Sequence, residues 1–406
     1  MTSRYAQLSH AELAALLPEL LLSGFMIDRA GMPWCIKEFG REVMEQIAID
    51  EWMLASPIYA KRIQQALDFE GDDVVTIFKA MQFDIGAPPQ YMDFRYVVHD
   101  RYHGEFFLNH CGSLLNLEPM GADFVQGMCH TIEDPTFDAT AIATNPRAQM
   151  RPIHRPPRVP SDRHPHCAWT VIIDDANPAV PEPAGLDDMR RTRVANLKLD
   201  SIDSSEPGNS DYSGPLLGDI DFSGFSHSAL VRLADETCIQ MHLLYLGFAR
   251  AVAKRTDPVT AASICLKQLT GFGAVTAERL RIGMQLPTTT QGALQALELH
   301  PLFNPADYVS ASRDGDQLHL NASLAHQDRA WVDLIGPHEV RPLQAIVRAI
   351  DPTTDVEVSG SQQDWTLRVT SGHQPTPEPR EVAMAKIGDG LSWRFEERAS
   401  LPLTVI

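Results

Sequence analysis

Apolar side chains recur at helical spacing through the first 83 residues, which predicts a block of helices at the start of the chain. Ser9 followed by Glu12 has the form of a capping box and marks the first helix start. Gly31 and Pro33 are expected to interrupt the second helix, and Pro57 is expected to break or kink the third. The expected helices are 9–22, 26–39, 41–55, 58–67 and 73–83.

The period of the pattern then falls to two residues, which predicts a small block of strands and helices. Tyr91–Val98 and Glu105–Cys111 alternate apolar and polar residues, like two strands joined by a turn. The other elements expected here are a helix over 118–130, a strand over 137–143, an extended Pro- and Arg-rich loop over 145–165 and a strand over 167–173.

Residues 174–228 are rich in Pro, Ser and Asp, above all in 177–185 and 204–211. Such a composition is not expected to bury a core. We therefore interpret 176–228 as a linker, part of which can wrap over a neighbouring element. It separates a first domain, 1–175, from a second, 229–406.

After the linker the pattern of the first half returns, with helical spacing over 229–253 and 260–284. Five short stretches then match stretches of the first half, in the same order and at similar spacings. The matched pairs are 277–280 with 60–63, 296–299 with 80–83, 318–323 with 106–111, 351–355 with 134–138 and 364–367 with 168–171. The sequence thus predicts an internal duplication within an α+β fold: two degenerate copies of a helical block followed by a small mixed α/β block.

A chain of 406 residues with 44% hydrophobic and 21% charged residues is typical of a soluble globular protein. The net charge of −19 repels phosphate backbones, so we expect no nucleic-acid partner. The longest apolar run, Leu13–Met26, is too short and too polar to cross a membrane, and no signal core precedes it. We therefore expect a cytoplasmic protein without a membrane partner or a nucleotide cofactor. Self-association into a homo-oligomer stays open.

Histidine and cysteine are concentrated between His99 and Cys167, which hold seven of the 15 histidines and three of the six cysteines. Each of these cysteines has a neighbouring histidine, in the pairs His110-Cys111, Cys129-His130 and His166-Cys167. Imidazole and thiolate bind metals and serve as base and nucleophile near neutral pH. At the aligned positions the second copy has Ala322-Ser323, Val347-Arg348 and Gln362-Gln363. Because the apolar positions persist while the pairs do not, a functional site is expected in the first copy.

Three interpretations of these pairs stay open. In the first, a divalent metal is bound. Zinc would suit Cys111, Cys129 and Cys167 with a fourth ligand such as His110, whereas zinc, iron or manganese would suit a site built from the histidines instead. In the second, a cysteine nucleophile works with a histidine base and an orienting carboxylate, drawn from Cys129, His130, Glu133, Asp134, His166 and Cys167. In the third, the cysteines are small core residues and the histidines decorate a polar loop. On a strand, only one member of each pair can face the site.

The loop from Arg147 to Arg163 carries five arginines in an otherwise acidic chain. Since guanidinium groups bind carboxylate and phosphate bidentately, Arg147, Arg151 and Arg155 are candidates to hold an anionic substrate. The competing interpretation is a solvated loop that pairs with acidic neighbours. The aromatic residues Phe25, Trp34, Phe39 and Trp52 are expected to pack in the core, although they could also line an apolar pocket.

The first copy resembles the L-2-amino-thiazoline-4-carboxylate hydrolase-like family and, more distantly, the vinyl-4-reductase-like small-molecule-binding domain. The resemblance covers about 11–173 and is carried by Trp34, Phe39-Gly40, Cys111, Cys129 with Asp134, and Cys167-Ala168-Trp169. It implies either a hydrolase that opens a C–N bond in a small ring or a ligand sensor with a cysteine-bound zinc. For the hydrolase, Cys129, Asp134 and Cys167 would be the site positions.

The sequence therefore favours a hydrolase or lyase that acts on a small, anionic or cyclic metabolite, with metal assistance in one version. Cys129 or Cys167 would be nucleophile or ligand, and His130 or His166 the base. The alternative is a non-catalytic small-molecule-binding protein whose cysteines, or zinc, are structural.

Overall fold

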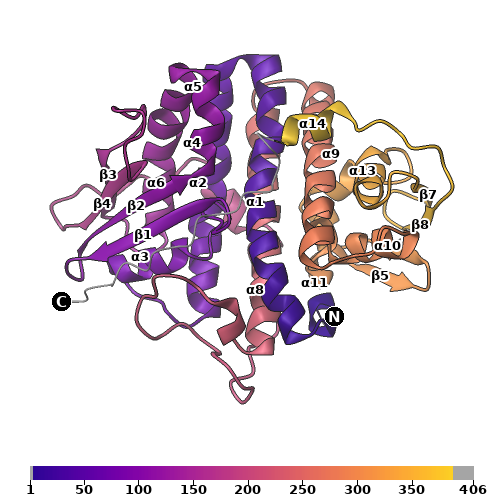
Figure 1. Ribbon diagram of the computed structural model, residues 1–406, viewed down its shortest axis with the longest axis horizontal. Helices are drawn as coiled ribbons and strands as arrows, with labels where there is room; N and C mark the ends of the chain where they lie inside the picture. Colours follow the sequence, from indigo (N-terminus) through magenta and orange to yellow (C-terminus); the bar gives the residue numbers. More distant parts are fainter. Residues whose placement is uncertain (1–2, 387–406) are drawn as a thin grey trace.

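Four long helices stand together at the centre of the molecule, and a four-stranded antiparallel sheet lies on either side of them (Figure 1). The computed structural model describes residues 3–386. The central helices are α1 (His10–Phe39), α2 (Arg41–Ala66), α8 (His227–Ala253) and α9 (Pro258–Gly283). Helices combined with separate antiparallel sheets make an α+β fold, which confirms the predicted fold class.

The first two helices are longer than the sequence indicated. The predicted capping box of α1 is present, because Ser9 and Glu12 each accept a hydrogen bond from the other's backbone N–H. The predicted interruption at Pro33 and the predicted break at Pro57 are wrong, since both prolines lie inside continuous helices. Proline removes one backbone hydrogen bond and favours a kink. Here burial of α1 and α2 against their neighbours outweighs that local cost.

The first sheet has the strand order β1-β2-β4-β3. Its strands are β1 (Met92–Val98), β2 (His103–Cys111), β3 (Ala148–His154) and β4 (Cys167–Ile173). Phe106 on β2 lies opposite Trp169 on β4, and both rings contact Phe137 of α6 (Glu133–Ile142) at centroid distances of 5.2 and 4.9 Å. Helix α6 also packs against α2, so it fixes the distance between the sheet and the helical layer.

One prediction between the strands is wrong, and two are wrong in part. The expected strand over 137–143 belongs to α6, whose Pro135 stands in the first turn, where a missing N–H is tolerated. The expected loop over 145–165 contains β3. The expected helix over 118–130 is divided by Gly121, whose φ of 111° breaks the helical path. Its parts are a 3₁₀ turn (Glu118–Met120), α5 (Ala122–Gln126) and a π-helical segment (Gly127–Ile132).

The second sheet has the order β5-β6-β8-β7, which repeats the pattern of the first. Its strands are β5 (Ala311–Asp314), β6 (Gln317–Leu320), β7 (Asp355–Gly360) and β8 (Trp365–Thr370). Helices α10 (Thr290–Leu299) and α13 (Arg341–Ile350) pack between this sheet and α9. The shorter helices of the molecule are α3 (Val74–Met81), α4 (Gly112–Leu117), α7 (Leu186–Arg190), α11 (Ala306–Val309), α12 (Leu324–Gln327) and α14 (Arg380–Ala385). Origin by duplication stays our inference from these equivalent orders. The last 20 residues of the predicted second copy lie outside the described residues.

The two halves meet along the central helices, where α1 packs on α8 and α9, and α2 packs on α8. Two ion pairs with little solvent exposure cross this contact. Arg62 binds Glu236 at 2.8 Å, and Arg279 binds Glu19 at 2.6 Å. A buried carboxylate without its partner would be costly, so each pair specifies how the helices align.

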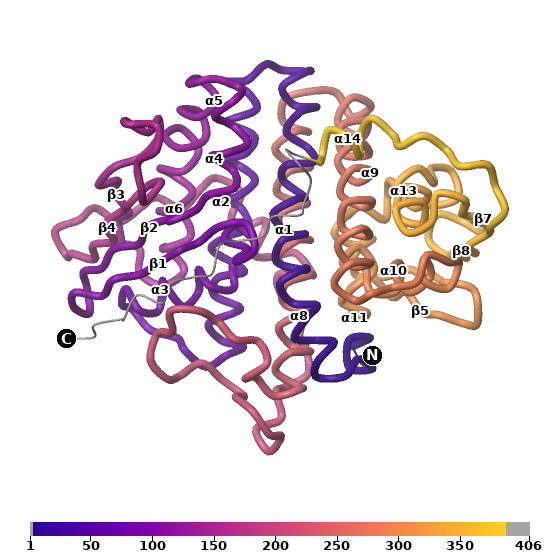
Figure 2. Tube along the Cα trace, in the orientation of Figure 1, coloured from indigo at the N-terminus to yellow at the C-terminus, as the bar shows by residue number. Residues whose placement is uncertain are grey.

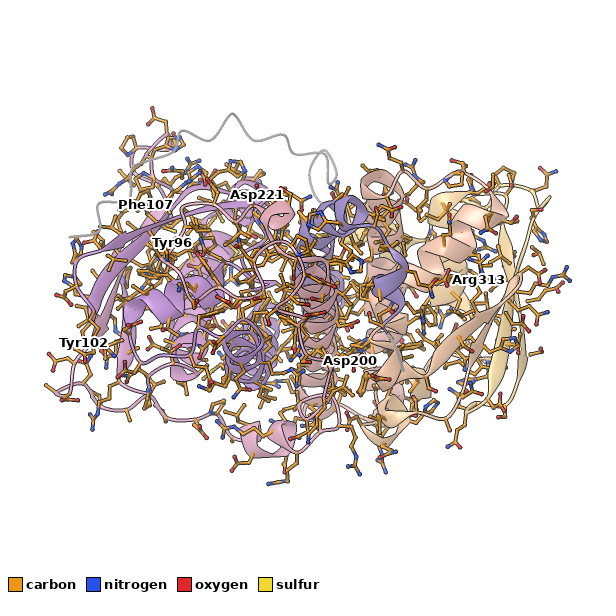
Figure 3. All side chains as sticks on the ribbon, turned by 90° about the horizontal axis from the view of Figure 1, so that it is seen from below. Tyr96, Tyr102, Phe107, Asp200, Asp221 and Arg313 are labelled. Carbon is orange, nitrogen blue, oxygen red and sulfur yellow. The ribbon has the colours of Figure 1, made fainter. Side chains whose placement is uncertain are left out.

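The linker is packed rather than free, contrary to the composition-based prediction. It forms α7 and buries apolar residues such as Met189, Tyr212 and Phe222. Lys79 donates hydrogen bonds to the carbonyl oxygens of Tyr212 and Gly214, at 2.7 and 2.6 Å. In Figure 2 the segment loops below α3 and the central helices, and Figure 3 labels two of its residues, Asp200 and Asp221, beside those helices. The expectation that part of it wraps over a neighbour is confirmed.

Although the sequence predicts that the run Leu13–Met26 is too short and too polar to cross a membrane, the whole of helix α1 is long and apolar enough to do so by length and composition alone. In this structure 67% of its most apolar window is buried inside the protein. Buried core helices of soluble proteins pass the same test, so the finding is weak evidence for a membrane span.

Candidate ligand cavity

A cavity of about 360 Å³ opens between the helical layer and the inner face of the first sheet. Its walls come from α1, α2, strands β1 to β3, the π-helical segment and α6. Met384 of α14, from the far end of the described chain, also contributes to the wall. Cavities of this size are typical of small-molecule sites.

Methionine and aromatic side chains dominate the walls. Eight of the 14 methionines line the cavity, namely Met32, Met44, Met81, Met92, Met120, Met128, Met150 and Met384. Phe25, Trp52, Phe94 and Phe137 add flat apolar surface. Methionine is flexible and polarisable, so such a wall adapts to differently shaped apolar ligands. Phe25 and Trp52 therefore line a pocket, which was the less favoured interpretation of these aromatic residues.

Three carboxyl groups in the wall have raised pKa values because burial disfavours their charged form. Burial raises the pKa of Asp28 and of Asp84 to about 6, and that of Glu133 to about 8. Asp84 accepts hydrogen bonds from Tyr59 Oη at 2.9 Å and from the Gly86 N–H at 2.7 Å. Asp28 accepts one from Trp52 Nε1 at 3.3 Å. At neutral pH, Glu133 is therefore mostly a neutral acid.

The cavity wall also contains two arginines. Arg41 is paired with carboxylates, at 3.5 Å from Glu45 and 3.2 Å from Asp123. Arg29 instead donates through Nη1 to two neutral oxygens, Tyr91 Oη at 2.9 Å and Ser113 Oγ at 3.5 Å.

The three predicted site cysteines do come together at the sheet side of the cavity. Cys111 ends β2 and lines the cavity, Cys167 begins β4, and Cys129 lies in the π-helical segment. All three are buried, and the negative charge of Glu133 adds to the rise of each thiol pKa. Cys111 also caps α4, because its Sγ accepts a hydrogen bond from the Leu114 N–H at 3.4 Å.

Burial is the main cause of the raised thiol pKa values. It raises the pKa of Cys111 to about 12 and places those of Cys129 and Cys167 far above the ordinary value. The thiolate is the reactive form of cysteine. These thiols are therefore protonated at neutral pH, which is the environment of structural cysteines.

The predicted histidine bases point to backbone groups. His166 is buried, its pKa is lowered by burial to about 4, and its Nδ1 accepts a hydrogen bond from the Cys111 N–H at 3.1 Å. His130 lies 2.7 Å from the Pro156 carbonyl oxygen. The ring of His110 lies 5.8 Å from that of His166, and burial lowers its pKa. Asp134 forms an ion pair with Arg155 rather than with a histidine.

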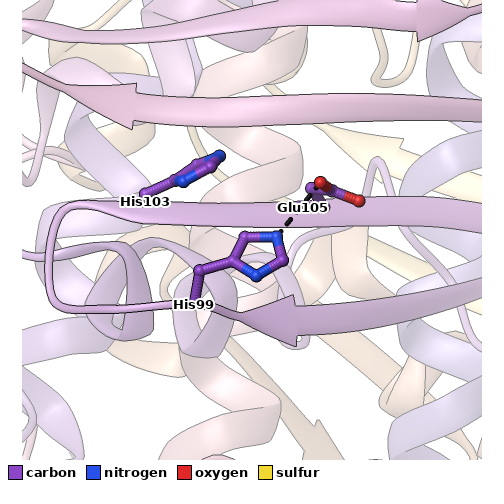
Figure 4. Close-up of side chains that lie close together, drawn as sticks. All are labelled: His99, His103 and Glu105. Carbon is purple, nitrogen blue, oxygen red and sulfur yellow. Dashed lines mark hydrogen bonds and ion pairs between the residues drawn. The ribbon is translucent and has the colours of Figure 1, made fainter. Parts of the chain in front are cut away.

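The predicted metal ligands do not share a tight centre. Among residues 3–386, no three of Cys111, Cys129, Cys167 and His110 bring their ligating atoms within 4.8 Å of one another. His99, His103 and Glu105 do meet that condition. His99 follows the end of β1, whereas His103 and Glu105 lie on β2, and His99 Nε2 is 3.0 Å from Glu105 Oε1 (Figure 4). This triplet is partly exposed and lies outside the cavity wall. Metal binding stays a prediction.

The predicted substrate arginines are engaged elsewhere. Arg147 donates to the carbonyl oxygen of Asp175 at 3.0 Å, Arg151 pairs with Asp138 at 2.9 Å, and Arg155 pairs with Asp134. None of the three lines the cavity. This arrangement fits the alternative in which the loop arginines pair with acidic neighbours.

Sequence analysis missed Asp28, Arg29 and Asp84 as cavity residues. A signal was present in the sequence, because Asp28-Arg29 interrupts a long apolar helix with two adjacent charges. Charged residues are rarely buried unless paired, so such a pair marks a position worth explaining. Glu133 was named only as a carboxylate that could orient a histidine base, and nothing in its polar stretch beside Asp134 marks it as a cavity residue.

Comparisons of this chain with protein-family models, with curated proteins and with solved structures found no match.

Proposed function

We propose that the first half of this protein binds a small, mainly apolar molecule in the cavity between α1, α2 and the first sheet. The observation that carries the proposal is the cavity of about 360 Å³ with its methionine and aromatic walls. An unfilled apolar space of this size costs stability, because the side chains around it lose packing contacts. A ligand that fills it restores those contacts.

The few polar groups of the wall support the same proposal. Small-molecule sites combine apolar walls with a small number of placed polar groups that orient the ligand. Among these groups are Asp28, Arg29, Asp84 and Glu133. Cys111 in the wall, and Cys129 and Cys167 beneath it, would then act as packing residues, in keeping with their burial.

Filling the cavity tests the proposal. The probe is the neutral apolar dye N-phenyl-1-naphthylamine, whose binding is followed by its own fluorescence and by that of Trp52 in the wall. We expect saturable binding to the native protein and at least about tenfold weaker binding to Ala48→Phe, which places a ring in the space. Gln65→Phe, at an exposed position of the same helix, is the matched control and should bind normally.

Equal binding by the native protein and Ala48→Phe would contradict the proposal. Melting temperatures show whether each variant is folded, and Thr140→Leu, on the opposite wall, gives a second and smaller obstruction.

A second candidate is catalysis in the same cavity, as a hydrolase or lyase. It is favoured by Glu133, whose pKa of about 8 suits proton transfer near neutral pH. The raised thiol pKa values argue against Cys129 or Cys167 as the nucleophile. If the cavity is catalytic, Glu133→Gln should retain the dye and lose turnover, whereas a protein that only binds has no turnover to lose.

A further inference from the structure

We infer that the ligand of this cavity is an amphiphilic anion, with an apolar body against the methionine walls and one acidic group on the guanidinium of Arg29. The inference rests on the proposed function and adds the chemical class of the ligand.

Within residues 3–386, Arg29 is a cation of the cavity wall without an ion-paired carboxylate. Its hydrogen bonds go from Nη1 to Tyr91 Oη and Ser113 Oγ, both uncharged. Among residues 3–386, no carboxylate lies within ion-pair distance of its guanidinium. A guanidinium has five N–H donors in a planar fork that fits a carboxylate, sulfonate or phosphate. The donors of Nε and Nη2 are therefore available to a ligand.

Two other arginines near the cavity have carboxylate partners, in contrast to Arg29. Arg41 lines the same cavity and contacts Glu45 and Asp123. Arg158, beyond the wall, pairs with Glu118 at 2.8 Å. In a chain with 53 acidic residues and 34 basic ones, an arginine without a carboxylate at a cavity wall is a specific feature. A guanidinium without a carboxylate partner can bind the acidic group of an external ligand.

The acidic groups of the wall do not take the place of that anion. Asp84 is held by Tyr59 and Gly86, and Glu133 is mostly protonated at neutral pH. Asp28 is adjacent to Arg29 in sequence, and its carboxyl group faces Trp52 and Glu51. Because the positive charge of Arg29 lowers the pKa of Asp28, the two groups interact, yet they do not form an ion pair.

The position of Arg29 orients the ligand. Its guanidinium stands over the Phe25 ring at 5.7 Å and reaches toward Ser113 at the start of α4. An acidic group bound there lies beside α1 and the start of α4, and an attached apolar chain would lie against the methionine walls. Carboxylate, sulfonate and phosphate monoester headgroups share this chemistry.

Three eight-carbon probes that differ only in their headgroup test the inference by displacing the neutral dye. They are octanoate, 1-octanol and octylamine at pH 7. We expect octanoate to bind the native protein about tenfold or more tightly than octanol, and octylamine to bind more weakly than both. Arg29→Met, which keeps the length of the stem, should abolish the octanoate preference and leave octanol within about twofold. Arg29→Lys should retain part of it.

Arg158→Met is the matched control, because it removes a guanidinium that is paired with Glu118 beyond the cavity wall and should leave the octanoate preference unchanged. If octanoate shows no preference in the native protein, or if Arg29→Met weakens octanol as much as octanoate, the inference is overturned while the cavity proposal stands. If the dye and all three probes fail to bind, the proposed function itself fails.

Discussion

At the scale of single residues, burial decides what the cysteines can do. All six are buried, and burial raises the pKa of every one of them, as in Cys111 and Cys265, whose pKa values reach about 12. We predict that none reacts rapidly with an aromatic disulfide reagent at pH 7 in the folded protein, and that all six react after denaturation. The measurement is the time course of thiol release with and without guanidinium chloride.

One fast thiol in the folded protein would contradict this prediction and restore the cysteine nucleophile. The variants Cys129→Ala and Cys167→Ala would then identify it by its loss. If the fast phase is absent, the same variants should lower the melting temperature, because each leaves a small gap in the core.

Part of the candidate site could be predicted from the sequence at the scale of single residues. The sequence pointed to Cys111, Cys129 and Cys167 as neighbours in the fold, and the structure brings them together around Glu133. It could not show that burial keeps them protonated, because a thiol pKa depends on the residues packed around it. Arg29 was missed because the lack of an ion-pair partner can be seen only in the three-dimensional structure.

At the scale of elements, the close approach of α8 and α2 depends on Gly247. A Cβ added there would lie 2.7 Å from the carbonyl oxygen of Glu51, and backbone cannot move aside as a flexible side chain can. We predict that Gly247→Ala destabilises the protein by about 1–3 kcal/mol, despite the higher helix propensity of alanine. Urea unfolding measures the change.

Gly214→Ala is the control, since nothing lies within 4 Å of an added Cβ at that position. It should leave the free energy of unfolding nearly unchanged. A Gly247→Ala protein as stable as the native one would show that α2 and α8 can separate without cost, and the packing described here would then be wrong.

The elements differed in how far the sequence could predict them. Helices α8 and α9 and strand β4 followed directly from their apolar periodicity. The predicted break at Pro57 was wrong because burial keeps α2 continuous through this proline. The strand predicted over 137–143 was wrong because a short apolar run fits a strand or a helix equally well. Only the packing of Phe137 on Trp169 in the folded protein distinguishes the two.

At the scale of the whole molecule, buried acids and buried histidines set opposing dependences of stability on pH. Besides Asp28, Asp84 and Glu133, burial raises the pKa of Asp235 to about 7. Burial lowers the pKa of His166 and of His242 to about 4, and that of His300 to about 3. An acid with a raised folded pKa keeps its proton in the folded state after the unfolded chain has lost it, so each such acid costs stability as pH rises. A histidine with a lowered folded pKa costs stability as pH falls below about 6.5.

Above about pH 6.5 the histidines are neutral in both states and only the acids still differ, so these signs predict that stability declines from there to about pH 8, the range in which Glu133 is still protonated only in the folded state. Urea unfolding at pH 5, 6, 7 and 8 measures it, in high salt to screen the repulsion that accompanies a net charge of −19. Glu133→Gln should flatten the decline, because an amide has no proton to lose, while Glu42→Gln, at an exposed position of α2, controls for the loss of one negative charge. Stability that stays level or rises between pH 7 and pH 8 would mean that the Glu133 carboxyl is hydrated. A hydrated carboxyl there would in turn make the cavity a polar site and remove the apolar environment on which ligand binding is proposed to depend.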